Sequence, residues 1–257
     1  MKQRYMKLIV VVIGILYLFA QTAYADIFTW TGLSASGHTV SLEAKLTITD
    51  EYTDGQFDTL TVIVKNATES FGGDAQVPSD VIGSFYFDIY DPTVDPSDPS
   101  YRPTLTYDSA TGDVYYDGVT TTDVAIRSPE DITGGWNFHP TDPTSFPYFG
   151  FGIGTVGNNT SGLITDPDNQ FNGSIVEGMN YSIYSDANPL NPGLQKVNLV
   201  NGEATFIFKG DLDGFFIGPA VGWGLGTGPD SFVPIPGAVL LGMLGLGVAG
   251  LKLRKYA

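Results

Sequence analysis

One ten-residue stretch alternates without interruption between polar and apolar side chains: Thr39-Val40-Ser41-Leu42-Glu43-Ala44-Lys45-Leu46-Thr47-Ile48. Successive side chains of a β-strand point to opposite faces, so this pattern predicts a strand with one buried face and one solvated face. A segment rich in Asp and Gly (residues 50–58) leads to a second apolar run, Leu60-Thr61-Val62-Ile63-Val64-Lys65. Two strand patterns joined by turn residues predict a hairpin.

Short strand patterns continue along the chain and indicate the fold class. Further strands are expected at residues 81–89, 104–107, 114–116, 124–127, 148–153, 181–184, 196–199 and 204–208. Outside the two termini, no segment keeps the 3.6-residue apolar stripe of a packed helix. We therefore expect an all-β fold, an antiparallel β-sandwich or a jelly-roll-like body. Two proline-bearing stretches, residues 91–99 and 129–147, are expected to be long surface loops.

The N-terminus has the three parts of a secretory signal peptide. A basic start precedes a 13-residue apolar run at residues 8–20, and the small residues Ala23 and Ala25 then precede Asp26. This order of charge, apolar length and small residues is typical of a cleaved export signal. We expect residues 1–25 to be removed before Asp26, and an uncleaved N-terminal anchor is the alternative.

The last 25 residues combine a proline motif, an apolar run and a basic end. The run at residues 235–251 contains five glycines and, as a helix, would reach roughly 25 Å, near the lower limit for crossing a membrane. Basic residues after such a run favour a cytoplasmic location for that end. The motif is Val233, Pro234, Ile235 and Pro236, and the basic residues are Lys252, Arg254 and Lys255. A permanent anchor and a buried core helix are the alternatives.

This tail resembles the PEP-CTERM sorting signal, which exosortases read in Gram-negative bacteria that make exopolysaccharide. Pro234 and Pro236 match the family's Val-Pro-Glu-Pro type motif, and Ile235 stands where that motif has Glu. Residues 79–89 are also similar to a strand of exosortase-dependent surface proteins. The resemblance implies export through the Sec translocon, transient membrane anchoring by residues 233–257, and cleavage near the proline motif by an exosortase. It further implies a cell-surface or extracellular-matrix protein that is associated with exopolysaccharide, and it transfers no catalytic residue.

Residues 26–232 are expected to form one domain, and their charge excludes several functions. This body holds six Lys or Arg and 28 Asp or Glu, a net charge of −22. Nucleic-acid binding requires basic residues that neutralise phosphates, so this class is excluded. The chain has no cysteine, so it forms neither a disulfide nor a thiolate metal site.

The sequence contains no recognisable catalytic motif, and we expect a protein that is not an enzyme. The nucleophile elbow Gly-x-Ser-x-Gly, the zinc helix His-Glu-x-x-His and the phosphate-binding glycine loop are all missing. The two histidines, His38 and His139, lie far apart in sequence, and each is expected to be a surface hydrogen-bonding group. The one cofactor considered is Ca²⁺, because Asp91, Asp95 and Asp98 could supply oxygen ligands without the EF-hand spacing. Turn formation is the alternative role of these carboxylates.

Two other functions remain open. A lectin-like module that binds carbohydrate, with Ca²⁺ assistance, would use an exposed aromatic side chain. The candidates are Trp30, Trp136 and Trp223; Trp136 lies in a Gly- and Pro-containing stretch and is the best candidate for exposure, although burial in the core is expected for each. A secreted glycoside hydrolase would need two carboxylates that flank a sugar, a geometry that sequence does not reveal.

Overall fold

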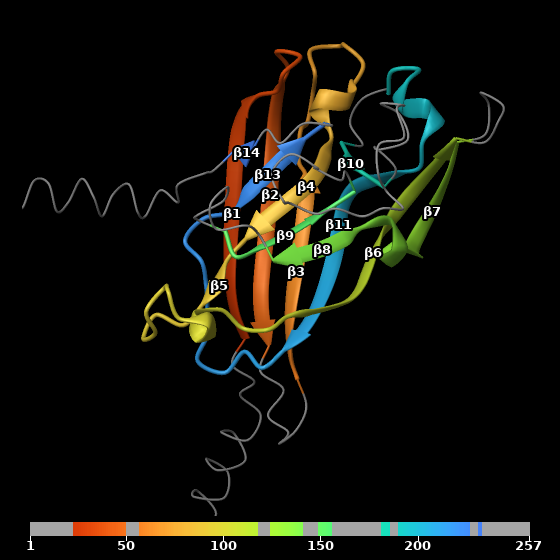
Figure 1. The fold of residues 1–257 in the computed structure, drawn as a ribbon. Coiled ribbons are helices and arrows are strands. Elements are labelled where there is room, and N and C mark those ends of the chain that lie inside the picture. The colour runs from red at the N-terminus through yellow and green to blue at the C-terminus, as the bar shows by residue number, and fades with distance from the viewer. Residues whose placement is uncertain are drawn as a thin grey trace, which may run out of the picture.

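The computed structural model describes residues 23–49, 57–117, 124–140, 149–155, 181–185, 190–226 and 231–232. These residues form mainly β-strands, with helical structure limited to short 3₁₀ turns (Figure 1). No helix among them is long and apolar enough to cross a membrane. Most of the expected signal peptide and the whole of the expected sorting signal lie outside the described residues.

The strands and 3₁₀ turns follow one another along the chain as follows. The strands are β1 (Ala23–Leu33), β2 (Thr39–Thr49), β3 (Asp58–Asn66), β4 (Ile82–Phe87), β5 (Ile89–Tyr90), β6 (Thr106–Asp117), β7 (Val124–Asp131), β8 (Asn137–Pro140), β9 (Phe151–Gly154), β10 (Ile183–Tyr184), β11 (Leu199–Gly210), β12 (Phe216–Ile217), β13 (Gly222–Leu225) and β14 (Ser231–Phe232). The 3₁₀ turns are η1 (Pro78–Asp80), η2 (Pro99–Tyr101), η3 (Thr133–Gly135) and η5 (Leu194–Lys196).

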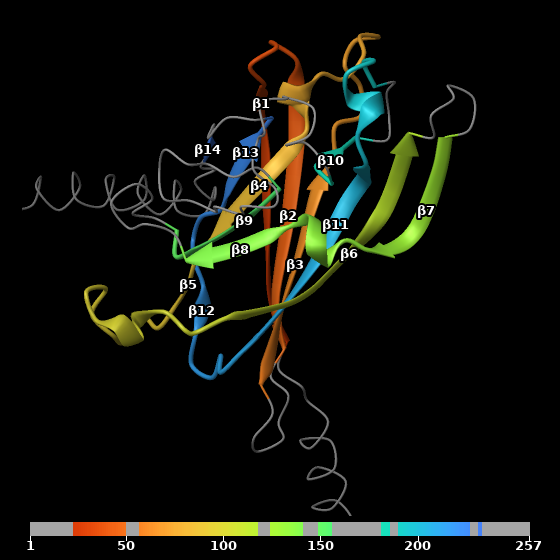
Figure 2. The ribbon, with the colours of Figure 1, turned by 45° about the vertical axis from the view of Figure 1, so that its right-hand side comes forward.

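Twelve of these strands belong to one curled, mixed sheet (Figures 1 and 2). Its first arm is β1-β2-β3-β11-β6-β7, and its second arm is formed by β8, β9, β4, β13 and β14. The short strand β10 joins the arms, because it pairs in parallel with β11 and antiparallel with β4. β12 and β5 form a separate two-stranded sheet.

The predicted hairpin is confirmed as β2 and β3. The two strands pair antiparallel from Leu42 opposite Asn66 to Thr49 opposite Thr59, without a register shift. The alternate residues from Val40 to Ile48 and from Leu60 to Val64 are buried, and the residues between them, polar except for Ile63, are exposed or half-buried. Alternation therefore fixes the register here, since a slip by one residue would turn the whole apolar set toward water.

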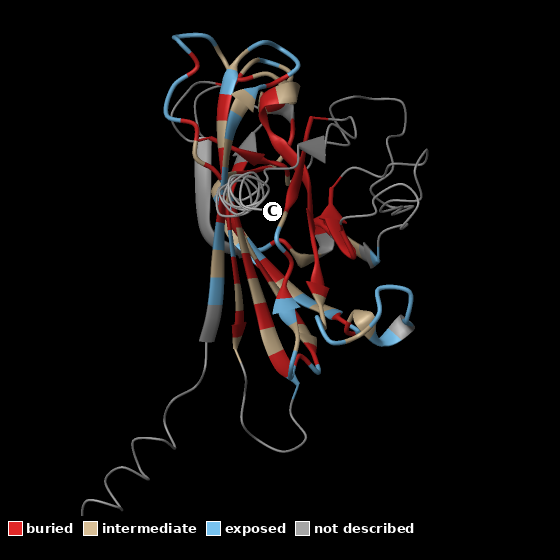
Figure 3. Cartoon of the chain, turned by 90° about the vertical axis from the view of Figure 1, so that its left-hand side faces the viewer, coloured by how far each residue is buried: buried red, intermediate tan, exposed pale blue. Residues whose placement is uncertain are grey.

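The core lies between the two arms, whose facing sides are buried (Figure 3). Phe208 of the first arm contacts Phe87 and Phe138 of the second arm, at ring-centroid distances of 5.6 and 4.8 Å. Phe206 meets the ring of Trp136 edge-on at 4.9 Å. These aromatic contacts give the curled sheet a continuous apolar interior.

The expected β-sandwich is not confirmed, although the all-β class is. Two separate sheets would have no hydrogen-bonded link, whereas β10 connects the arms into one sheet. The β10–β11 pair is also parallel, so the sheet is mixed rather than purely antiparallel. Side-chain alternation reports which face of a strand is buried, and it carries no information about which strands are neighbours.

Several expected boundaries were wrong. The strands expected at 104–107 and 114–116 are one continuous strand, β6, and the loop expected at 129–147 contains the end of β7 and the whole of β8. Residues 196–199 were expected to form a strand of their own, but they hold the end of η5 and only the first residue of β11. β8 has only four residues, of which Phe138 packs against the core, so alternation could not predict it, and its pairing with β9 keeps it extended.

Candidate functional site

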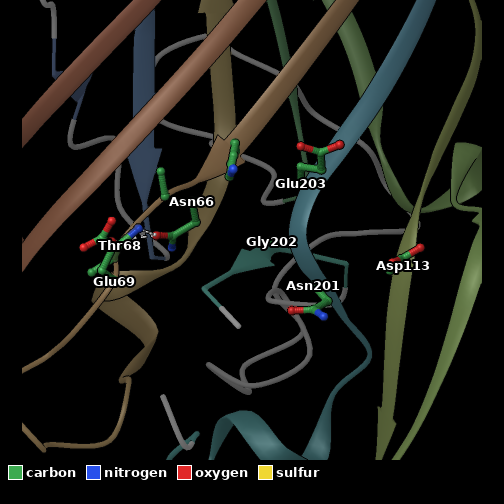
Figure 4. A pocket seen from close by; sticks show the side chains of 9 residues that line it. Asn66, Thr68, Glu69, Asp113, Asn201, Gly202 and Glu203 are labelled. Atoms are coloured by element: carbon green, nitrogen blue, oxygen red, sulfur yellow. Dashed lines mark hydrogen bonds between the residues drawn. The ribbon is translucent and has the colours of Figure 1, made fainter. Parts of the chain in front are cut away.

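A polar pocket of 620 Å³ opens where β3, β6 and β11 meet (Figure 4). Its lining combines three carboxylates, two amides and one lysine: Lys65, Asn66, Ala67, Thr68, Glu69, Asp113, Asn201, Gly202 and Glu203. In Figure 4, Glu203 and Asp113 project from neighbouring strands of the first arm, and Glu69 lies across the opening. The pocket is thus built from segments far apart in sequence.

A break in β11 creates this opening. The register between β11 and β6 shifts between Asn201 and Ala204, so β11 carries a bulge. Gly202 has a φ of +73°, a left-handed conformation that glycine adopts without steric cost. Before the bulge, Val200 lies opposite Ile183 of β10; after it, Glu203 lies opposite Lys65 of β3. On this side β11 therefore pairs with β10 before the bulge and with β3 after it. The pocket forms where these two neighbours diverge, which we call the fork of β11.

One amide at the base of the pocket has an unused acceptor. The Oδ1 atom of Asn201 is buried and has no hydrogen-bond partner among the described residues. By contrast, the side chain of Asn66 donates to the carbonyl of Asp80 (2.9 Å) and accepts from the Thr68 hydroxyl (2.8 Å). Asn66 and Thr68 thus form a fixed wall of the pocket, while the side chain of Asn201 would have to turn before its buried Oδ1 atom could meet a bound group. A buried acceptor without a donor costs free energy, so this amide is a locally unfavourable feature of the pocket lining.

The charge of the pocket limits the kind of ligand. Three carboxylates against one ammonium give a net charge of −2 and disfavour anions. Carboxylate and amide oxygens accept hydrogen bonds, so hydroxyl and ammonium donors fit this lining. Among the described residues, no three His, Asp or Glu side chains gather as they would around a metal ion. The acceptor groups and negative charge of the lining therefore suit a ligand with hydroxyl or ammonium groups.

A second polar cluster fixes the turn between β1 and β2. The carboxylate of Asp80 is fully buried and accepts hydrogen bonds from Ser34 (2.6 Å), Ser36 (2.8 Å), Nδ1 of His38 (2.8 Å) and the Val77 amide (2.9 Å). Burial alone would raise the pKa of Asp80, but these four hydrogen bonds outweigh burial and hold the pKa below its usual value. The cluster ties the turn to η1.

This cluster differs from a catalytic triad in where its hydroxyls point. Ser34 and Ser36 both bond to Asp80 itself, on the Nδ1 side of His38. The Nε2 atom of His38 faces the exposed Asp74 at 3.9 Å. A triad needs the nucleophile hydroxyl at the free imidazole nitrogen, and neither serine lies there. His38 is thus a hydrogen-bonding group near the surface, as expected, with a structural role.

The aspartates considered for Ca²⁺ each hold a turn of their own. The Oδ1 atom of Asp91 accepts both the amide and the hydroxyl of Thr93 (2.8 and 2.7 Å). Asp95 and Asp98 make the same pair of bonds with the serine two residues later: Ser97 at 2.9 and 2.7 Å, Ser100 at 2.8 and 2.7 Å. These are turns in which Asp bonds the chain two residues on, which matches the turn-forming alternative.

The tryptophans do not provide an exposed platform for a sugar. Trp136 is 2% exposed and Trp223 is fully buried, so the candidate role of Trp136 as an exposed stacking residue is wrong. Trp30 is half-buried and packs against the same core. Burial was expected for all three side chains. Trp136 and Trp223 are fully packed between the arms, where bulky aromatic groups contribute much of the buried apolar area.

The remaining predicted sites are placed as follows. Ala23, Ala25 and Asp26 lie in β1, where Asp26 is opposite Leu46. The backbone of His139 lies in β8 opposite Gly152. The sorting motif at residues 233–236 and the basic residues of the tail lie outside the described residues.

Sequence reasoning missed the polar pocket. Asn201-Gly202 stands between two expected strands, and an Asn-Gly pair is a turn signal. The structure shows a bulge within one long strand instead. Asp113 and Glu69 reach the same place only through the pairing of β6 and β3 with β11. Comparisons with family models, with curated proteins and with solved structures gave no match, so the pocket is interpreted from its own geometry.

Proposed function

We propose that this chain is an exported, exosortase-processed, non-enzymatic protein of the cell surface or extracellular matrix, associated with exopolysaccharide. The observation that carries the proposal is the pairing of an export signal at residues 1–25 with a proline motif, short apolar run and basic end at residues 233–257. The acidic, cysteine-free body between them suits a soluble exported domain.

The described fold is compatible with both cuts. Removal of residues 1–25 would leave β1 paired with β2 from Asp26 opposite Leu46 to Leu33 opposite Thr39. At the other end, β14 closes at Phe232, immediately before the proline motif. Cleavage near the motif would therefore leave the last described strand intact. Most of the sheet, including the whole hairpin of β2 and β3, is independent of either cut.

Deletion of residues 233–257 is expected to abolish surface display while leaving export intact. The reason is that a short apolar run would hold the chain beside the processing enzyme only until cleavage. The measurement is the intact mass and C-terminal peptide of the protein recovered from its producing cells, together with its distribution between envelope and medium. The matched control exchanges Pro234 and Pro236 for Ala, which keeps the apolar run and should block cleavage. Recovery of exported, unaltered protein that still ends at Ala257 would contradict the proposal.

A second candidate function is saccharide binding in the pocket at the fork of β11. It is favoured by one observation, the gathering of the carboxylates of Glu69, Asp113 and Glu203 around one pocket that holds a single lysine. Sugar hydroxyls supply the donors that this lining lacks. The net negative charge of the lining favours neutral or amino sugars over uronates.

Glu203→Gln is expected to weaken saccharide binding about 10- to 100-fold, because a hydrogen bond to a charged group contributes about 1.5–3 kcal/mol. The measurement is titration calorimetry of the processed protein with neutral, amino and acidic oligosaccharides chosen by a glycan array. Glu43→Gln is the control, since Glu43 lies in the same cross-strand row, opposite Lys65, and does not line the pocket. Equal binding by both variants, or binding of uronates alone, would exclude the pocket as the site.

A further inference from the structure

Among the described strands, β1 is an edge of the sheet. It pairs with β2 over all eleven of its residues, in continuous register, and no described strand pairs with its other side (Figure 1). An edge strand presents a row of backbone N–H and C=O groups that can pair with another strand. A long, regular edge of this kind is a ready surface for association.

This edge lacks the features that usually prevent pairing. From Ile27 to Leu33 it contains no charged residue and no proline, and its register with β2 shows no bulge. Ile27 and Leu33 are 64% and 63% exposed, although both are large aliphatic side chains. Natural edge strands are protected by lysine, proline, bulges or a cover, so an apolar, unprotected edge indicates a partner.

We propose that β1 pairs antiparallel with β1 of a second copy of this chain, about a two-fold axis at Trp30. In this register Ile27 lies opposite Leu33 of the partner subunit, and Thr29 lies opposite Thr31 of the partner subunit. The two first arms then form one continuous sheet. This inference concerns assembly and is independent of the proposed export and processing.

The register follows from backbone geometry and side-chain matching. In an antiparallel pair, two directly opposed residues either both point their N–H and C=O groups toward the other strand or both point them away from it. Ile27 and Leu33 are six positions apart, an even offset, so their backbone groups point to the same side of the strand and both satisfy this condition. Their pairing occurs twice about the axis, and each contact covers two exposed aliphatic side chains. A register centred on Thr29 would place Ile27 opposite Thr31 and Leu33 opposite Ala25, so neither would meet a large aliphatic side chain.

The neighbouring charges allow a second copy at this edge. On β2, Lys45 lies beside Ile27 and Glu43 lies beside Thr29. In the paired sheet, the strand beyond the partner's β1 presents the partner's Thr39 and the partner's Ser41 in these rows, so no like charges stand opposite one another. A body with a net charge of −22 repels a second copy over most of its surface. The uncharged edge from Ile27 to Leu33 opposes association least.

The inner face of β1 also fits the symmetric pair. Phe28 would lie opposite Gly32 of the partner subunit and would meet the tryptophan ring that covers this glycine. A Cβ on Gly32 would come within 2.2 Å of the Trp30 ring, so this ring lies over the glycine and leaves no room for another side chain there. A self-complementary patch of this kind is what a two-fold dimer requires.

The cysteine-free chain provides a direct test of the register. Thr29→Cys and Thr31→Cys are prepared separately, mixed as processed protein, and oxidised. We expect a disulfide dimer in the mixture and little or none in either variant alone, because Cβ atoms of directly opposed residues are about 4.5–5.5 Å apart. Thr47→Cys on β2 is the control and should give no dimer with either variant. A dimer from Thr29→Cys alone would overturn the proposed register.

Light scattering tests the assembly itself. The unaltered protein is expected to have twice the mass of one body, and Leu33→Lys is expected to weaken dimerisation at least tenfold. Thr47→Lys adds the same charge to the same face of the sheet and should leave the dimer intact; circular dichroism confirms the fold of each. A folded, monomeric unaltered protein at tens of micromolar would overturn the proposal. Slow amide exchange along β1 in such a monomer would show that another segment of the same chain covers the edge.

Discussion

Phe208→Ala is expected to lower the free energy of unfolding by about 3–5 kcal/mol, the usual cost of truncating a fully buried aromatic side chain. Phe208 contacts Phe87, Phe138 and Tyr107, at ring-centroid distances of 5.6, 4.8 and 5.6 Å. Two of these rings belong to the opposite arm, so the cavity would open at the point where the arms meet. Urea denaturation followed by tryptophan fluorescence measures the loss.

The matched control is Phe57→Ala. Phe57 is 66% exposed, and surface substitutions of this kind change stability by about 0.5 kcal/mol or less. If Phe208→Ala cost no more than Phe57→Ala, the two arms would not be packed through this ring. A second, independent transition in the variant alone would instead show that the arms had become separate folding units.

Asp80→Ala is expected to destabilise the protein by about 3 kcal/mol, because it leaves several buried donors without their acceptor. For a chain of this size the loss corresponds to a melting temperature lower by roughly 6–12 °C. Asp74→Ala is the control: its side chain is 79% exposed and stands 3.9 Å from His38. A loss confined to about 0.5 kcal/mol in both variants would exclude a structural role for the cluster.

The same substitution should change the acid sensitivity of the fold. The pKa of Asp80 is lowered in the folded protein, so its ionised form contributes stability above the usual value of 3.8. That contribution is lost as the pH falls below 3.8 and through the folded pKa. The unaltered protein and Asp80→Ala should therefore differ in stability at neutral pH and converge in acid. A difference that stays constant from pH 7 to the acid transition would show that ionisation of Asp80 does not stabilise the fold.

Local patterns predicted the strands whose two faces differ. The alternation from Thr39 to Ile48 gave β2, its partner β3 and their hairpin, because burial on one face fixes both the conformation and the register. The same reasoning failed for β8 and for the division of β6. Those segments are extended because neighbouring strands hydrogen-bond to them, and the neighbours come from distant parts of the chain.

The candidate site shows the same limit. Glu203 and Asp113 were two carboxylates among 28 in the sequence. Only the pairing of β6 with β11, and the bulge at Gly202, brings them to one pocket with Asn201. His38 and Asp80 are likewise 42 residues apart, and their hydrogen bond depends on how η1 packs against the first hairpin turn.

The sequence by itself determined the all-β class, the first hairpin and the charge of the body, because each depends on composition or on residues close together in the chain. It also predicted the export and sorting signals, which are linear. Tertiary structure alone decided that the arms form one curled sheet, that Trp136 and Trp223 pack between these arms, and that β1 is an edge among the described strands. These features arise from pairing between distant segments. The free energy of such pairing depends on both segments together, so no single stretch of residues determines it.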